Sequence, residues 1–487
     1  MENGDLLIAE VARWIEPATV TPYFLDLAAP VLLDSSSSDG RLGRYSYFSA
    51  APAMLLESTA GALILKGGPA GAHPLPDADP WSAIARLLAP YRHEPCRGIP
   101  PFQGGALGYV GYEVGRAVGR LGPRRPRSGP ALPDLHLGFY DWVLARDHAV
   151  GRSWLIVHVL AAGGAAAARQ RLAWLQGRLP ATPCALPPPE PVASGSHGPV
   201  QSTFSRADYL DAVVRAKEYI TAGDIYQVNL SQRLEMDSAR TADPWQTYLR
   251  LRAGSPVPFG AYLGVDQETA LLCGSPELFL HLDAQGYVET KPIKGTRPRG
   301  TGPAADHALA VDLQTSAKDR AENVMIVDLL RNDLGRVCRT GSVAVPLLWH
   351  VESYASVHQL VSTVTGRLRP EHDAVDLLRA CFPGGSVTGC PKVRAMQIID
   401  ELEPSSRGPY CGTLGYIAYN GVMETNIVIR TVVMAHGRAY VQVGGAIVAD
   451  SDPAAEYEET LVKARAALTA LGHAAVVVQA AGSAAHG

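Results

Sequence analysis

A stretch rich in proline, glycine and serine interrupts the chain near its middle. Residues 181–200 read ATPCALPPPEPVASGSHGPV, and such a composition neither sustains a helix nor fills a core. The preceding residues 161–180 are rich in alanine, arginine and leucine, which predicts a helix. We therefore expect an N-terminal region over 1–180, a linker over 181–200 and a C-terminal region from residue 201 onward.

Helical and strand-like patterns alternate through the C-terminal region. Helices are predicted over 205–223, which ends in glycine, over 308–335, and from Pro453, a residue that suits a first helical turn, to 472. Strand-like runs occupy 228–236, 261–265, 270–274, 412–421, 425–435 and 439–449. This mixture predicts an α+β fold whose strands are largely antiparallel.

The bulk properties exclude several classes of protein. The formal net charge is −4, so no strong electrostatic footprint for nucleic acid is present. No run of about 20 apolar residues could span a membrane, and the start MENGDLLIAEVARW lacks the features of a signal peptide. A cytoplasmic protein is expected. The seven cysteines contain no C-x-x-C pair, so neither a zinc site nor a disulfide framework is expected.

Two acidic pairs stand at helical spacing on the two long predicted helices. Asp319 and Glu322 are three residues apart, as are Glu456 and Glu459, so each pair shares one helix face. Two such helices side by side would gather four carboxylates, the hard oxygen ligands that Mg²⁺ prefers. Lys463 follows Glu459 by four residues and could pair with an acid or a substrate anion. The alternative is that these acids are solvated surface residues.

Seven segments resemble the signature of the chorismate-utilising enzymes, a family that includes anthranilate, aminodeoxychorismate, isochorismate and salicylate synthases. They are PGGSVTGCPKVRAMQIIDELEP, DIYQVNLSQR, GSPELFL, KPIKGTRPRG, ENVMIVDLLRNDLGRV, GTLGYIAYNG and EYEETLVKARA. The resemblance covers residues 201–470, which it identifies as the chorismate-binding catalytic domain, and it extends more loosely to an anthranilate synthase component I-like region over 1–180. It implies a sandwich-like α/β core with the active site in a cleft between sheet and helices. Residues 471–487 are expected to form a flexible tail.

The resemblance also assigns roles to the acidic residues. Glu322 and Glu459 match direct Mg²⁺ ligands, and Asp319 and Glu456 match partners that act through water. Asp319 departs from the glutamate that is common at its position, and a water molecule can bridge the shorter reach. Glu277 in GSPELFL matches the general acid that helps the C4 hydroxyl of chorismate to leave, and its apolar neighbours favour a raised pKa.

Further positions match residues around the substrate. The side chains that match the lining of the pocket are those of His358, Thr388, Tyr416 and Arg430, and Arg430 offers a fork for a carboxylate. Gly444 and Ala446 in VGGAIV match backbone donors to a carboxylate, and small side chains there would let the substrate approach closely.

Two positions distinguish the reactions within the family. Isochorismate and salicylate synthases carry a lysine base where this chain has Gln227, and glutamine cannot act as that base. Anthranilate synthases read PIAGT where this chain reads PIKGT, whereas aminodeoxychorismate synthases carry a lysine, as Lys294 does here. In those enzymes the lysine attacks C2 and ammonia then enters at C4. The resemblance therefore implies C4 amination of chorismate on the route to 4-aminobenzoate and folate.

Three alternatives remain open at this point. Lys294 taken alone could be an exposed lysine on a glycine-rich turn. The chain could be an anthranilate synthase component I of tryptophan biosynthesis. It could also be a subunit that binds chorismate without turning it over, although Glu277, Lys294, Glu322 and Glu459 are all present.

Two partners are implied by the resemblance. No cysteine lies in a G-x-C-x-G context, so ammonia is expected from a separate glutamine amidotransferase subunit. The segments PVLLDS and GRYSYFS resemble a pocket that holds tryptophan in relatives, with Ser35, Tyr45 and Ser46 as its candidate wall. A packed β-hairpin without a ligand is the alternative.

Overall fold

The computed structural model describes residues 2–3, 5–37, 42–68, 71–76, 79–119, 121–122, 129–159, 164–192, 199–238, 242–354, 357–473 and 478–480. The expected tail over 471–487 lies largely outside the described residues, because 474–477 and 481–487 are not among them.

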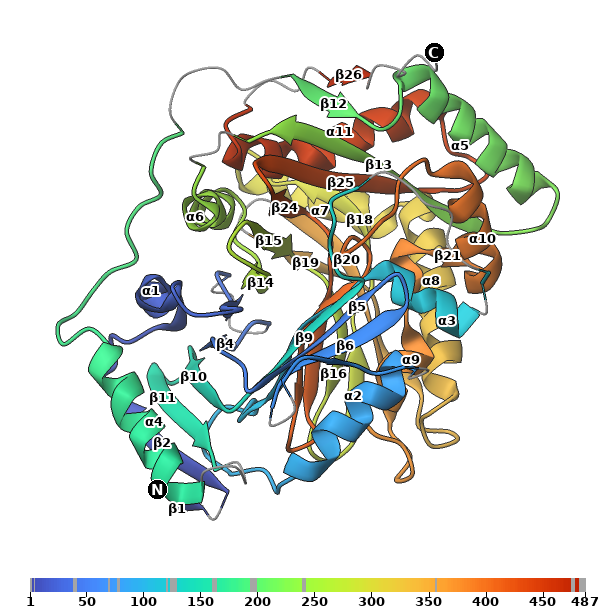
Figure 1. Cartoon of the computed structure of the whole chain (residues 1–487). Coiled ribbons are helices and arrows are strands. Elements are labelled where there is room, and N and C mark those ends of the chain that lie inside the picture. The colour runs from blue at the N-terminus through green and yellow to red at the C-terminus, as the bar shows by residue number, and fades with distance from the viewer. Residues whose placement is uncertain are drawn as a thin grey trace.

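One large sheet runs through the upper and left parts of the molecule in Figure 1. Its order is β1 (Glu2–Asn3), β2 (Leu6–Val11), β11 (Arg152–His158), β10 (Trp142–Asp147), β4 (Tyr45–Ser49), β3 (Val31–Asp34), β14 (Phe259–Gly264), β15 (Thr269–Ser275), β24 (Thr431–Ala435), β25 (Arg438–Ile447), β13 (Gln227–Asp237), β12 (Val200–Ser202) and β26 (Val478–Ala480), with β21 (Gly389–Cys390) beside β13. Neighbouring strands are antiparallel except β12 and β26, which are parallel.

The second sheet is antiparallel throughout its described pairings. Its order is β18 (Ile293–Pro298), β20 (Val357–Arg367), β17 (Tyr287–Thr290), β16 (Leu278–Leu282), β23 (Met423–Ile427), β22 (Thr413–Ala418), β8 (Gly105–Val110), β9 (Leu135–Tyr140), β5 (Met54–Thr59), β6 (Ala62–Gly67) and β7 (His73–Pro74), with β19 (Ala344–Ser353) beside β20. Both sheets combine strands from either side of residues 181–200, since β3 pairs with β14 and β22 pairs with β8.

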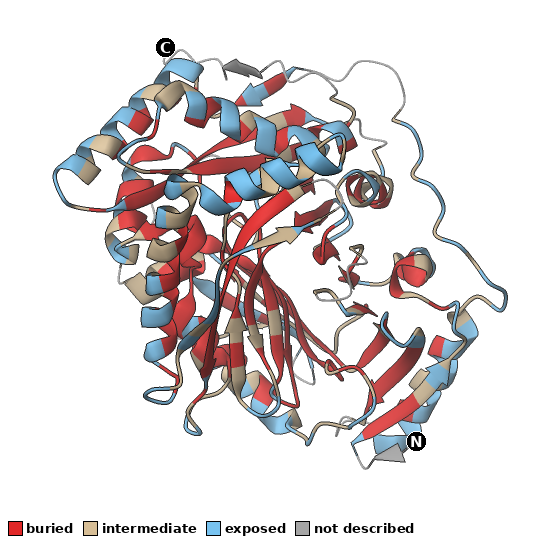
Figure 2. Cartoon of the chain, turned by 180° about the vertical axis from the view of Figure 1, so that it is seen from behind, coloured by how far each residue is buried: buried red, intermediate tan, exposed pale blue. Residues whose placement is uncertain are grey.

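Aromatic and aliphatic side chains from both sheets form one shared core. Tyr47 of the first sheet lies 5.5 Å from Phe102 and 5.5 Å from Tyr416 of the second, measured between ring centroids. Two further cores lie under the helices on the outer faces. In Figure 2 the strands in the middle of the molecule are buried, whereas the helices expose one side. The central strands of both sheets are therefore fixed by packing on their two faces.

The helices cover the outer faces of the sheets. They are α1 (Pro17–Val20), α2 (Pro80–Leu88), α3 (Gly115–Gly119), α4 (Gly164–Arg178), α5 (Arg206–Thr221), α6 (Pro244–Gly254), α7 (Pro303–Thr315), α8 (Ala317–Gly335), α9 (Ala374–Cys381), α10 (Lys392–Leu402) and α11 (Pro453–Ala470), with short 3₁₀ turns η1 (Thr21–Phe24), η2 (Ala89–Tyr91), η3 (Tyr112–Val114) and η4 (Gly385–Val387). Helix α11 packs on β25, and α8 packs on β18 and β20. No helix within the described ranges is both long and apolar enough to span a lipid bilayer.

The structure confirms the α+β class with largely antiparallel sheets flanked by helices. The single helix predicted over 308–335 is wrong, because the chain forms α7 and α8 instead. Ser316 between them has φ −59° and ψ 113°, and its hydroxyl accepts a hydrogen bond of 3.3 Å from the Asp319 amide. Serine is a favoured helix N-cap, so a new helix starts here. Asp319 consequently lies in the first turn of α8.

Residues 181–192 have no regular secondary structure and are mostly exposed. In Figure 1 they follow α4 at the lower left and run along the outside of the molecule. The strand predicted over 425–435 is likewise divided, into β23 and β24, because Arg430 between them adopts a left-handed backbone conformation with φ 51°.

Candidate active site

Lys294 lies in an irregular part of β18. The pairing of β18 with β20 shifts register between Ile293 and Thr296, so Lys294 and Gly295 form a bulge. Bulges redirect side chains from the regular alternation of a strand. Gly295 has φ +81°, and a Cβ atom placed on it would lie 2.8 Å from Oδ1 of Asp319. The glycine of PIKGT is therefore required both by the backbone conformation and by the nearness of α8.

Glu277 lies between β15 and β16 and is buried, with 5% of its surface exposed. The Ser386 hydroxyl donates a hydrogen bond of 2.7 Å to its Oε1. Burial raises the pKa of Glu277 above its usual range, although the hydrogen bond from Ser386 and the charge of Lys294 oppose the shift. A carboxyl group with a raised pKa keeps its proton more readily, which suits a general acid.

Lys294 contacts the same residue from the other side. Its Nζ donates a hydrogen bond of 3.0 Å to the backbone carbonyl of Ser386. Burial lowers the pKa of Lys294 from its ordinary value, against the opposing charges of Glu322 and Glu277. A lysine whose pKa is lowered is more often neutral and therefore nucleophilic. The structure thus brings an acid and an amine together around Ser386.

Arg430 faces Glu277. Burial lowers the pKa of its guanidinium and the carboxylate of Glu277 opposes that shift. A left-handed conformation is uncommon for a residue with a side chain and is often found at functional sites. Arg430 adopts this conformation in the short connection between β23 and β24.

The acidic residues of α11 face the end of β25. Glu456 is buried and accepts a hydrogen bond of 2.6 Å from the Ser451 hydroxyl. A Cβ atom placed on Gly445 would lie 3.0 Å from Glu456 Oε2 and 3.9 Å from Glu459 Oε1. Lys463 lies 2.7 Å from Glu459 and donates a hydrogen bond of 3.0 Å to the Gly444 carbonyl. Two of the small residues of VGGAIV therefore lie beside the acidic face of α11.

The acidic residues of α8 face the same place. Burial raises the pKa of Glu322, and the charges of Asp319 and Glu456 raise it further against the attraction of Lys294. Asp319 also pairs with Arg297 at 3.0 Å. In Glu459 burial acts to raise the pKa, but the ammonium of Lys463 lowers it below its usual range. The carboxylates of α8 and α11 are therefore close enough to influence one another's charge.

These carboxylates are the candidate ligands of a metal ion. Among the described residues, no group of three or more Asp, Glu, His or Cys side chains is gathered closely enough to hold a metal ion directly. The donor atoms nevertheless fit Mg²⁺, because they are all carboxylate oxygens and Mg²⁺ usually keeps several waters and binds through only one or two carboxylates. Burial is the largest cause of the raised pKa of Glu322 and of Glu456. The charge of Glu456 adds to the shift at Glu322 and that of Glu459 adds to the shift at Glu456, and a dication would relieve this repulsion.

His358 lies on β20, and Thr388 directly follows the short turn η4. His358 is the partner of Arg297 across β18 and β20, and its ring nitrogens lie 2.9 Å from Asp306 Oδ1 and 2.8 Å from the Ser353 hydroxyl. Thr388 is fully buried, and its hydroxyl donates a hydrogen bond of 2.8 Å to the Gly384 carbonyl. Thr388 therefore shares the 384–388 segment with Ser386.

Tyr416 lies elsewhere, in the core between the sheets. Its ring centroid is 4.7 Å from that of Phe102, and the described contacts place it near Tyr47 rather than near Lys294. Its role against substrate stays a prediction. The candidate tryptophan wall lies on the adjoining strands: the Ser35 amide donates a hydrogen bond of 3.0 Å to the Ser46 hydroxyl, and the buried Ser35 hydroxyl has no partner among the described residues.

Sequence reasoning did not single out Ser386. Its place in the quoted segment PGGSVTGCPK was a signal, but only the structure shows that it contacts both Glu277 and Lys294. Gln227 is fully buried and its side-chain amide has no described partner on either atom.

Comparison with known proteins decides the family. The model of chorismate binding enzymes matches residues 36–469. The chain belongs to this family. It is 45% identical over 387 residues to aminodeoxychorismate synthase component 1 of Salmonella typhimurium. The aligned region covers 79% of this chain and 81% of that protein. It is 43% identical over 395 residues to anthranilate synthase component 1 of Thermus thermophilus, covering 81% and 82%.

A solved structure supports the same placement. Anthranilate synthase component I from Streptococcus pneumoniae superposes with a TM-score of 0.76 at 32% identity, covering 87% of this chain and 92% of that one. The residues that match the chorismate-binding family include strands of both sheets and every candidate site residue from Glu277 to Lys463.

Proposed function

We propose that this chain is the large subunit of an aminodeoxychorismate synthase, which replaces the C4 hydroxyl of chorismate by an amine and retains the enolpyruvyl group. The observation that carries the proposal is the contact of Lys294 and Glu277 with the same residue, Ser386. An amine and a carboxyl group held side by side can attack one carbon of a ring while protonating a leaving group on another. Relatives named aminodeoxychorismate synthase component 1 support it.

The reaction proceeds in two displacements. The neutral amine of Lys294 forms a bond to C2, a ring double bond shifts, and the C4–oxygen bond breaks as Glu277 gives its proton to the departing hydroxyl, which leaves as water. Ammonia then forms a bond to C4, the double bond shifts back, and the bond between C2 and the protonated nitrogen of Lys294 breaks, which releases the lysine as a neutral amine. The ammonium group formed at C4 gives one proton back to Glu277. The lowered pKa of Lys294 and the raised pKa of Glu277 both favour the protonation states that the first step needs.

The substrate is held by groups on several elements. Arg430 pairs with a carboxylate through its guanidinium, and the backbone of β25 at Gly444 and Ala446 accepts close approach because the side chains there are small. Lys463 contributes a further positive charge beside Gly444. His358 and Thr388 complete the pocket in this proposal, whereas Tyr416 packs against Phe102 and Tyr47 between the sheets.

Mg²⁺ is the proposed cofactor. Glu322 and Glu459 would hold it, with Asp319 and Glu456 acting through water, and when bound it supplies positive charge that offsets a substrate carboxylate. The described carboxylates of α8 and α11 support this assignment because the charge of Glu456 on α11 raises the pKa of Glu322 on α8, which burial has already raised.

Ammonia is proposed to come from a separate glutamine amidotransferase subunit. A glutaminase needs an activated thiolate, whose pKa is lowered. Here burial raises the pKa of Cys273, Cys381 and Cys390, that of Cys338 to about 11 and that of Cys411 to about 12. These thiols are therefore poorly suited to attack glutamine, and the name component 1 of the relatives fits a chain with a second component.

A bound tryptophan is a separate part of the proposal. The unpaired hydroxyl of Ser35, next to Ser46 and Tyr45, supports a polar ligand at this place. Asp34 accepts hydrogen bonds from Tyr248 at 2.9 Å and from Arg252 at 2.5 Å, so its carboxylate is already occupied. Titration with tryptophan, compared between the native chain and Ser35→Ala, would test it.

Anthranilate synthase is the second candidate, favoured by the similarity to the Thermus thermophilus enzyme. One experiment separates the two. The purified chain is incubated with chorismate, Mg²⁺ and excess ammonium at mildly alkaline pH, and the product is identified by mass. An aminodeoxychorismate mass supports the proposal, whereas anthranilate, which has lost the enolpyruvyl group, would make the second candidate correct. Binding of chorismate without turnover would favour a non-catalytic subunit.

A further inference from the structure

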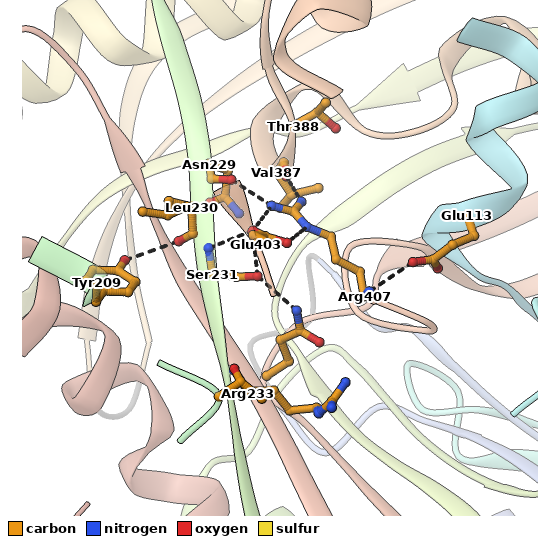
Figure 3. A network of polar contacts seen from close by, with 12 residues as sticks. Glu113, Tyr209, Asn229, Leu230, Ser231, Arg233, Val387, Thr388, Glu403 and Arg407 are labelled. Atoms are coloured by element: carbon orange, nitrogen blue, oxygen red, sulfur yellow. Dashed lines mark hydrogen bonds and ion pairs between the residues drawn. The ribbon is translucent and has the colours of Figure 1, made fainter. Parts of the chain in front are cut away.

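Arg407 and Glu403 form a buried ion pair beside the candidate site. Each side chain is 1% exposed, and the pair makes two hydrogen bonds, from Nε to Glu403 Oε2 at 2.9 Å and from Nη2 to Glu403 Oε1 at 2.6 Å. Burying two charges costs much of what their attraction gains, so such a pair is weak evidence for stability. Its other contacts, drawn in Figure 3, point to a different purpose.

The guanidinium also binds two backbone carbonyls. It donates to the Val387 carbonyl at 2.9 Å and to the Asn229 carbonyl of β13 at 2.6 Å. Val387 directly follows Ser386, which contacts both Lys294 and Glu277. The rigid planar fork of an arginine fixes the direction of each bond that it makes. Arg407 therefore holds the carbonyl of Val387, the residue next to Ser386, which contacts both the Lys294 amine and the Glu277 carboxyl group.

The carboxylate of Glu403 anchors this arrangement to the first sheet. Its Oε1 accepts hydrogen bonds of 2.8 Å from the amide and 2.8 Å from the hydroxyl of Ser231 on β13, and that hydroxyl accepts one of 2.9 Å from Gln442 on β25. The Asn229 amide in turn donates to the Thr388 carbonyl at 2.9 Å. The 384–388 segment is thus tied to Asn229 of β13 both through Arg407 and directly, and β13 pairs with the strand that carries Gly444 and Ala446.

The N-terminal region contributes one more tie. The backbone amide of Arg407 donates a hydrogen bond of 2.9 Å to Glu113 Oε1, and the guanidinium lies 4.6 Å from the ring centroid of Tyr112. Arg407 is consequently held on its own backbone as well as at its side chain.

We propose that Arg407, held by Glu403, is a positioning residue that fixes the Ser386–Val387 segment. It thereby sets the distance of Lys294 and Glu277 from β25, the strand whose Gly444 and Ala446 lie beside the substrate in the proposed function. The proposal rests on the proposed function for the identity of the reaction. Because Arg407 touches neither the amine nor the acid, its loss should reduce turnover rather than substrate binding. A displacement of about 1 Å in a catalytic group can reduce a rate by about 100-fold.

The test compares kcat and KM for chorismate in ammonium-dependent turnover, with thermal unfolding measured on the same samples. Arg407→Lys keeps the charge but loses the fork, and we expect kcat to fall about 10-fold to 100-fold while KM changes less than about threefold. Ser231→Ala removes one of the bonds to Glu403 and should give a smaller loss of kcat. Arg407→Met should be worse than Arg407→Lys, so that the conservative variant gives partial rescue. Ser231→Ala keeps the test decisive if Arg407→Met does not fold.

Arg233→Lys is the matched control. The Arg233 side chain is 3% exposed, pairs with Glu235 at 2.7 Å and reaches the Ser406 carbonyl at 3.3 Å, and these acceptors lie outside residues 384–388. It should lower the unfolding temperature while leaving kcat within about twofold, because neither of these acceptors belongs to the 384–388 segment that contacts Lys294 and Glu277. A folded Arg407→Lys with native kcat, or a loss of kcat no greater than that of the control, would overturn the proposal. If the native chain makes a different product from chorismate, the proposed function fails, but the comparison of kcat still decides the role of Arg407.

Discussion

Gly295 lies against Asp319 so closely that a Cβ atom on the glycine would be 2.8 Å from the aspartate Oδ1. This contact joins the bulge that carries Lys294 to the first turn of α8. Any side chain at residue 295 must therefore move one of the two elements.

Gly295→Ala tests this relationship. A left-handed conformation costs a residue with a side chain about 1–2 kcal/mol, and the contact with Asp319 adds to that cost. We expect a lower free energy of unfolding and at least about a 10-fold loss of turnover, measured by denaturant unfolding and by product formation. Gly302→Ala is the control, because a Cβ there meets nothing within 4 Å. Native activity in Gly295→Ala would show that the bulge does not position Lys294.

The pH dependence of turnover should be bell-shaped. Lys294 must be neutral to attack, so activity rises with pH on the acid limb, and its lowered pKa moves this limb to lower pH. Glu277 must be protonated, so activity falls with pH on the alkaline limb, and its raised pKa moves this limb to higher pH. Both limbs should therefore lie between the ordinary values of a carboxyl and of an amine, with apparent pKa values that belong to the pair. Glu277→Gln should remove one limb and slow turnover by about 10²-fold to 10⁴-fold.

Lys294→Ala should impair C4 amination, and an unchanged rate and product would refute its covalent role.

Removal of one carboxylate should weaken the response to Mg²⁺. In Glu459→Ala a proposed direct ligand is lost, so the Mg²⁺ concentration for half-maximal activity should rise by about 10-fold or more, the usual range for losing a contributor to a metal site. Glu458→Ala is the matched control, since Glu458 is exposed and lies 3.9 Å from Arg206. Equal responses to Mg²⁺ in both variants would remove Glu459 from the metal site.

The source of nitrogen gives a further test. The isolated chain should convert chorismate with ammonium salts but not with glutamine, because burial raises the pKa of its buried thiols. Product formation is followed with each nitrogen source at equal concentration. Glutamine-dependent turnover by the pure chain would contradict the need for a separate glutaminase.

His158 should make the fold sensitive to acid. Burial, helped by the neighbouring His93, lowers the pKa of His158 to about 4. Below its ordinary value of about 6.5 the unfolded chain binds a proton that the folded chain does not, so stability falls as pH drops from about 6.5 to 4. The loss is about 3 kcal/mol, since one pKa unit corresponds to about 1.4 kcal/mol. His158→Phe should flatten this dependence in unfolding experiments, whereas His436→Phe, at an exposed position, should not.

Local patterns were sufficient for most of the elements. Apolar spacing predicted α5 and α11, and the run ALLCG predicted β15, because the period of a helix or strand is a property of neighbouring residues. The same reasoning joined α7 and α8 across Ser316, since the hydrogen bond by which Ser316 caps the start of α8 is not visible in the apolar pattern. The acidic pairs on α8 and α11 were also visible, but not their approach to each other.

By itself, the sequence determined the α+β class, the family and the chemical types of the candidate groups, through periodicity and through the motifs around Glu277, Lys294 and Glu459. Only the tertiary structure decided that Ser386, 92 residues from Lys294 and 109 from Glu277, holds both of them, and that Arg407 holds the Val387 carbonyl beside it. The physical reason is that hydrogen bonds depend on distance and direction between groups far apart in the chain. Those distances arise only when two sheets, each built from both halves of the sequence, pack around one core.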